Sequence, residues 1–162
     1  MFCIAVTLSA VLSLASESLM AGAGVAVALL ILALFIGLGI LFDIIGVAVT
    51  AADEKPFHSM AAHREKGARE TLRLLKNASR VSSVCNDVVG DICGIVSGTT
   101  AAVIVTQLQR SLNTRTVLLS VGVTALISGL TIGGKALGKT FAIRKSTQVV
   151  FLAGRFLHLF HR

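Results

Sequence analysis

The sequence predicts an all-α membrane protein with three to four transmembrane helices, a cytosolic juxtamembrane amphipathic helix and a C-terminal interfacial helix. Its 162 residues are 54% hydrophobic and only 14% charged, whereas a soluble domain of this length needs more charged side chains to cover its surface. The charges also gather in blocks between long apolar runs. We therefore treat residues 1–162 as a single transmembrane domain whose main solvent is the lipid bilayer.

The first element is an apolar run, residues 2–20, that contains several serines and Glu17. A spanning helix needs about 20 mostly apolar residues, so we expect this run to be a fourth span. The alternative is a secretory signal, although the run has no positive n-region and is followed by a poor cleavage site.

Three further apolar runs meet the length of a span, and they cover residues 24–52, 81–108 and 117–141. Residues 56–77 begin with Pro56 and place apolar side chains on one stripe, which predicts the juxtamembrane amphipathic helix. The tail, residues 145–162, combines a polar face with apolar ones and predicts the interfacial helix.

Basic residues indicate the orientation of these spans. Seven Lys and Arg lie between Asp53 and Arg80, and five lie from Lys139 to the end. Short cytoplasmic loops hold the excess of such residues, so we expect segment 53–80 and the C-terminus to be cytosolic. The same charge predicts attraction to anionic lipid rather than binding of nucleic acid.

Four charged residues from three spans are expected near the middle of the bilayer. Asp43, Asp87, Asp91 and Lys135 lie roughly 10 to 16 Å along their helices from the charged residues that flank the spans, because a helix rises about 1.5 Å per residue. An ionised side chain there costs at least about 2.5 to 3.5 kcal/mol, so such residues are normally paired or functional.

Oxygen-bearing side chains surround these charges, and they suit Mg²⁺, another hard cation or a proton relay. The predicted metal ligands are Asp43, Ser83, Asn86, Asp87 and Asp91, with Lys135 as the counter-charge. The alternative is structural: Lys135 bridges two aspartates, the third is protonated, and the helices are fixed in register. No nucleophile and base can be assembled, so we do not expect an enzyme.

Small residues recur at helical spacing in two spans and predict close helix packing. They are Gly90, Gly94 and Gly98 in the second long run and Gly129 and Gly133 in the third. These faces are compatible with a homodimer or with contacts to other membrane proteins.

The stretch FDIIGVAVTAADEKPFHSMAAHREKGARETLRLLKNASRV carries a resemblance to a known family. A span ending in F-S-x-S-E-T-A-[LI]-T is matched by Phe42, Ala48 and Thr50. The juxtamembrane pattern that follows it is matched by Met60, Ala61, Gly67, Ala68, Leu72, Leu74, Leu75, Asn77 and Arg80. Asn86 loosely matches a G-N-T-x-x-N pattern, and a G-E-x-x-P-K-T-x-A pattern is matched by Gly134, Lys139, Thr140 and Ala142. The chain thus resembles the transmembrane domain of the CNNM/CorB family of magnesium and cobalt transport proteins.

The resemblance implies a dimeric protein of a prokaryotic cell membrane that moves or senses Mg²⁺ or Co²⁺. Three departures qualify this: Gly46 and Lys135 stand where the family has glutamates, and Gly138 stands where it has proline. Cation handling is therefore rebuilt around other acids, or lost in a non-transporting scaffold. The family continues into CBS modules about where this chain stops, so we do not expect nucleotide gating.

Overall fold

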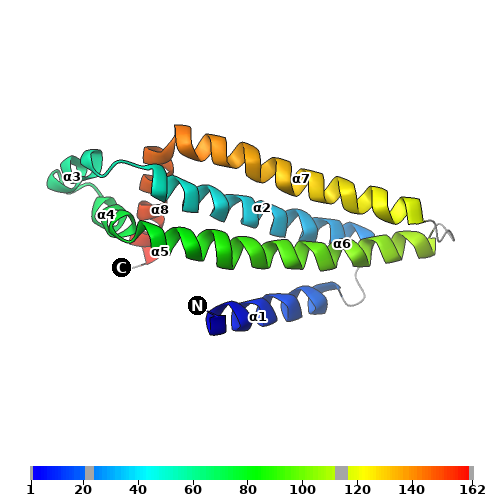
Figure 1. Ribbon diagram of the computed structural model, residues 1–162. Coiled ribbons are helices and arrows are strands. Elements are labelled where there is room, and N and C mark those ends of the chain that lie inside the picture. Colours follow the sequence, from blue (N-terminus) through cyan, green and yellow to red (C-terminus); the bar gives the residue numbers. More distant parts are fainter. Residues whose placement is uncertain (1, 21–23, 112–116, 161–162) are drawn as a thin grey trace. The chain divides into compact units, whose positions relative to one another are not determined.

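The computed structural model describes residues 2–20, 24–111 and 117–160, and helices account for nearly all of them (Figure 1). None of these residues lies in a β-strand, so the predicted all-α class is confirmed. The helices are α1 (Phe2–Met20), α2 (Val25–Ala51), α3 (Lys55–Ala62), α4 (Ala68–Lys76), α5 (Ala78–Ser83), the π-helix η1 (Val84–Gly90), α6 (Asp91–Ser111), α7 (Val117–Arg144) and α8 (Ser146–Phe160).

Three helical stretches in the described part of the chain are long and apolar enough to cross a membrane: Val25–Ala51, Ala78–Arg110 and Ser120–Arg144. They agree with the three long runs of the sequence to within a few residues at most ends. The run at 2–20 forms α1, but only Val6–Ala15 of it qualifies, as a shorter apolar helix. The structure thus supports three candidate spans, and the turn expected between the last two falls largely on residues 112–116, outside the described residues.

The chain divides into two compact units, and the long helices α2 and α7 contribute to both. The first unit contains Met1–Ile40 and Val88–Gly134. In it α1 packs on α6, and aliphatic side chains of α2 and α6 form the centre of the core. The main buried residues are Ile31, Leu32, Phe35, Ile92, Val96 and Ile104.

The second unit contains Leu41–Asp87 and Lys135–Arg162. Its core gathers side chains from four other helices around the fully buried Phe57 of α3. They are Ala48 and Val49 of α2, Leu75 of α4, Ala142 of α7 and Val150 of α8. α4 packs on α8 and on α3. Glycines make the first of these contacts close: a Cβ on Gly67 would lie 2.8 Å from the backbone of Arg155, and one on Gly154 would lie 2.9 Å from the carbonyl oxygen of Gly67.

The juxtamembrane segment differs from the single helix expected over 56–77, because it forms two helices, α3 and α4, joined by a turn at 63–67. Arg64 has φ 57° and Gly67 has φ 92°, both left-handed. The amides of Arg64 and Glu65 donate to the carbonyls of Ala61 and Met60 at 3.1 and 3.0 Å. Left-handed backbone at a residue with a Cβ costs about 1 kcal/mol, so the turn holds Arg64 in an unfavourable conformation.

The second candidate span also contains irregular backbone, since η1 separates α5 from α6. A π-helix is rare, and short stretches of it within α-helices often accompany functional sites. η1 includes Asn86 and Asp87 of the predicted metal site. The tail helix α8 agrees with the expected interfacial helix, whose last two positions lie outside the described residues.

Candidate cation site

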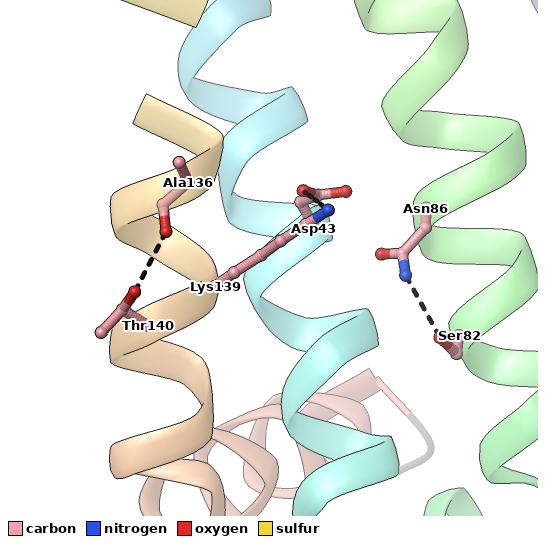
Figure 2. A network of polar contacts seen from close by, with 6 residues as sticks. All are labelled: Asp43, Ser82, Asn86, Ala136, Lys139 and Thr140. Carbon is pink, nitrogen blue, oxygen red and sulfur yellow. Dashed lines mark hydrogen bonds and ion pairs between the residues drawn. The ribbon is translucent and has the colours of Figure 1, made fainter. Parts of the chain in front are cut away.

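Asp43 is the buried charge of the second unit, only 5% exposed on α2. Its Oδ2 lies 3.8 Å from the Nζ of Lys139, whose own side chain is 55% exposed. In Figure 2 the lysine side chain extends from α7 to the carboxylate. The carboxylate thus has Lys139 as a cationic partner, which reaches it from a largely open position.

Asn86 lies on η1 in the same unit, and its amide is fixed by two neighbours. Its Nδ2 donates a hydrogen bond to the Oγ of Ser82 at 3.2 Å. A Cβ on Gly46 of α2 would lie 2.8 Å from the Cγ of Asn86. The absence of a side chain at Gly46 therefore makes room for this amide.

Two buried oxygens at this place have no hydrogen-bond donor among the described residues: Oδ2 of Asp43 and Oδ1 of Asn86. Buried polar atoms are nearly always hydrogen-bonded, and each exception requires an explanation. Figure 2 shows the Asn86 oxygen pointing toward α2, the helix of Asp43. A carboxylate oxygen and an amide oxygen are ligands that a hard cation prefers.

The other predicted ligands lie differently. Asp87 and Asp91 are exposed, and Ser83 is half-buried. Asp91 belongs to the first unit and Asp87 to the second. No three His, Cys, Asp or Glu side chains of the described residues are grouped so that they could hold a metal ion. The structure therefore shows the buried Asp43 and the buried Oδ1 of the half-buried Asn86 as candidates, and the wider five-residue site stays a prediction.

The structure shows a second lysine near the predicted counter-charge Lys135, which itself stays a prediction. Lys135 is half-buried on α7, whereas the ion pair of Asp43 is made by Lys139. The two lysines are one helical turn apart. Depth along the helix therefore does not determine which of them reaches Asp43. The hydroxyl that contacts Asn86 belongs to Ser82, the neighbour of the predicted ligand Ser83. Residues four apart, such as Ser82 and Asn86, lie on the same helix face, and this signal would have identified Ser82.

The predicted packing glycines divide into two groups. Gly90 is buried in the first unit. By contrast, Gly94, Gly98, Gly129 and Gly133 are exposed, and a Cβ on any of them would meet nothing within 4 Å. These four glycines therefore have no packing role among the described residues of this chain, and their faces are open to lipid or to another helix.

Comparison with known proteins gives one significant match. Residues 29–162 match the family described as the cyclin M transmembrane N-terminal domain, which leaves α1 and the first turn of α2 outside. Neither the curated proteins nor the solved structures show a significant match. The matched region covers most of the chain, including Asp43, Asn86 and Lys139. This membrane protein therefore belongs to the cyclin M (CNNM) transmembrane domain family.

Proposed function

We propose that this protein binds a divalent cation, Mg²⁺ or Co²⁺, at Asp43 and Asn86, and moves or senses it at the membrane. The observation that supports this is the pair of buried oxygens without hydrogen-bond donors, Oδ2 of Asp43 and Oδ1 of Asn86. Leaving such an atom without a donor costs about 1 to 3 kcal/mol. Lys139 offsets part of this cost at Asp43, and a cation ligand would offset it at both oxygens.

The chemistry of Mg²⁺ suits a site with few protein ligands. This ion loses water reluctantly and commonly binds through one or two carboxylates while keeping several water molecules. Asp43 would supply the carboxylate and Asn86 a neutral oxygen, with the hydroxyl of Ser82 holding the amide in place. A partly hydrated cargo ion is also easier to release than a fully coordinated one.

Lys139 acts as a competitor of the cation in this proposal. Its ammonium neutralises Asp43 when no ion is bound. An arriving cation takes over the carboxylate, and the long, half-exposed lysine side chain moves toward the surface. The pair thus sets a threshold concentration below which the site stays closed by its own cation.

The competing function is a non-transporting scaffold that associates with another membrane protein. The Asp43–Lys139 pair favours it too, because the buried charge is already balanced within the chain. Under this alternative the pair only fixes α2 against α7 in the second unit.

Calorimetric titration of Mg²⁺ into protein purified in a neutral detergent distinguishes these functions. We expect the wild type to bind and Asp43→Asn and Asn86→Ala to abolish binding while unfolding at a similar temperature. An Asp87→Asn, Asp91→Asn double variant should still bind, and its loss of binding would favour the wider five-residue site. Absence of binding to a folded wild type would favour the scaffold.

We also propose a homodimer in a prokaryotic cell membrane, with segment 53–80 and the C-terminus in the cytosol. The exposed glycines of α6 and α7 support the dimer, since small residues let helices from two chains approach closely. The concentration of basic residues in segment 53–80 supports the orientation. No enzymatic step is proposed.

A further inference from the structure

An open pocket of about 410 Å³ lies at the turn between α3 and α4, within the second unit. Its lining includes three exposed cationic side chains, Arg64, Lys66 and Arg69. The remaining charged lining consists of Glu65, Glu70 and His158. A concave surface with three cations that are close together in the chain is suited to a multiply charged anion.

The acidic residues leave these cations available. Glu70 has a side chain that is 17% exposed, and its Oε1 lies 3.0 Å from Nδ1 of His158 on α8. That carboxylate is thus held by His158, and the two glutamates together offset two of the three cationic side chains. The pocket therefore has a net positive charge.

The backbone points to a function for Arg64 in particular. Arg64 is the one non-glycine residue with positive φ in the described part of the chain. Glycine adopts that conformation without a steric penalty, and strained residues of this kind concentrate at ligand sites. Since glycine would fit this backbone conformation better, the arginine at position 64 points to a function of its side chain.

The walls of the pocket are held in place by close packing. Gly67 contacts the backbone of Arg155, and Thr71 Oγ1 donates to the carbonyl of Gly67 at 2.8 Å. The amides of Glu65 and Ala68 also donate within the turn, to Met60 and Glu65. The cationic side chains thus extend from a fixed backbone, which lowers the entropic cost of binding.

Chain connectivity puts the pocket beside the membrane. α3 and α4 connect the end of one candidate span at Ala51 to the start of the next at Ala78, and α8 follows the third span at Arg144. On α8, Leu152, Phe156 and Leu159 share one face and are 63 to 73% exposed. Such a face inserts at the boundary between headgroups and acyl chains, the depth at which lipid phosphates lie.

We infer that this pocket is a phosphate-binding site, with Arg64, Lys66 and Arg69 as the anion ligands. The phosphate comes from the headgroup of an anionic phospholipid or from a soluble phosphate, and both present the same group to the guanidinium and ammonium donors. Arg64 supplies the bidentate contact and Lys66 a point charge.

The test uses the full chain in a neutral detergent, titrated with inorganic phosphate and, separately, with micelles containing short-chain phosphatidic acid. The test variant is Arg64→Gly, Lys66→Gln, which removes two lining cations and relieves the strained backbone at 64. The control is Lys55→Gln, Lys76→Gln, which removes the same charge from exposed positions of α3 and α4 outside the pocket lining.

We expect the test variant to bind phosphatidic acid at least tenfold more weakly than the wild type, and the control to bind within about twofold of it. Inorganic phosphate that binds with the same pattern identifies a soluble ligand, and binding of the micelles alone identifies a headgroup. Equal loss in the two variants, or binding of neither probe to the wild type, would overturn the proposal, because the first indicates general charge attraction and the second the absence of a site.

Discussion

At the scale of single residues, the free-energy cost of burying the Asp43 carboxylate depends on its cationic partner. A carboxylate taken out of water loses hydration, and attraction to a cation restores only part of that loss. Lys139 provides the cation at 3.8 Å, longer than a direct hydrogen bond. The pair is therefore a loose one, which a competing divalent ion can separate more readily than a bidentate arginine contact.

Substitution of Lys139 tests this competition. Lys139→Gln keeps a polar side chain but removes the ammonium, so Mg²⁺ should bind about tenfold more tightly. The unfolding free energy without Mg²⁺ should fall by about 1 kcal/mol or less, because solvent already screens the half-exposed lysine. Calorimetry and thermal unfolding measure the two effects, with Lys145→Gln as a control for net charge.

A loss of stability with no change in Mg²⁺ affinity would mean that Lys139 is only a structural partner of Asp43. An unchanged affinity in Lys145→Gln is required for the comparison to hold, since that lysine is exposed at the end of α7.

Gly46 offers a second test at this scale. Gly46→Ala places a Cβ against the Asn86 amide, so the amide must rotate and lose its hydrogen bond to Ser82. A lost hydrogen bond costs about 1 kcal/mol, and alanine returns about 0.5 to 1 kcal/mol through helix propensity. Stability should hardly change, while Mg²⁺ binding should fall at least tenfold.

The matched control is Gly37→Ala on the same helix, where the new Cβ meets nothing within 4 Å. This variant should be slightly more stable and bind Mg²⁺ normally. Normal binding in both variants would show that the Asn86 amide is not a ligand.

The sequence predicted the residues of this site only in part. Depth along the helix indicates Asp43, and an oxygen-bearing side chain beside Asp87 and Asp91 indicates Asn86; the structure shows both with buried oxygens. Lys139 was counted with the basic tail, because distance along the chain does not say how far a long side chain reaches back into a span. The space that Gly46 leaves for Asn86 depends on the distance between two helices, which no local pattern encodes.

At the scale of elements, α4 and α8 are joined by a pair that responds to pH. The hydrogen bond from His158 and the charge of Arg73 hold the pKa of Glu70 below its ordinary value of 4.5. A carboxyl group whose pKa is lower in the folded than in the unfolded protein stabilises the fold at any pH above its pKa in the unfolded protein. This contribution is lost as the pH falls through the pKa of the folded protein.

The unfolding free energy should therefore drop as the pH falls below about 4.5, by on the order of 1 kcal/mol or less for this partly solvated pair. Urea unfolding at a series of pH values measures it, and Glu70→Gln should remove this component of the slope. A Glu70→Gln profile parallel to that of the wild type would mean that the pair contributes nothing.

Helical elements were predicted well where apolar length decides them and poorly where backbone geometry does. The candidate spans follow from composition, but the break at 63–67 does not. Gly67 lies beside an apolar stripe that continues on both sides, so periodicity alone indicates one helix. The π-helix η1 is likewise invisible to periodicity, since it depends on which carbonyl each amide selects.

At the scale of the whole molecule, the spans leave much apolar surface uncovered by the chain itself. Large apolar side chains of α7 are exposed along its length, among them Leu118, Leu126, Leu130 and Leu137. Lipid or a second chain must cover this surface. The composition predicts that this apolar surface must be covered, whereas the choice between lipid and a second chain depends on the shape of the helix surface.

Substitution of the exposed glycines of α7 tests whether a second copy of the chain packs against this helix. Gly129→Leu, Gly133→Leu adds bulk where no atom of this chain lies within 4 Å, so the protomer should keep its unfolding temperature. If the dimer packs through these glycines, the cross-linked fraction in native membranes should fall at least tenfold. Thr124→Leu, Ser128→Leu adds similar bulk on another exposed side of α7 and should leave the dimer intact. Equal cross-linking in both variants would place the dimer contact elsewhere.

The contact between Gly46 and Asn86 also limits the routes by which this sequence can change. Any side chain at position 46, an acidic one included, would push aside the Asn86 amide, because its Cβ would lie 2.8 Å from the Cγ of Asn86. The two positions are therefore coupled: a residue larger than glycine at 46 requires a different position of the side chain at 86. An acidic residue introduced at 46 should consequently be tolerated only together with a smaller residue than asparagine at 86.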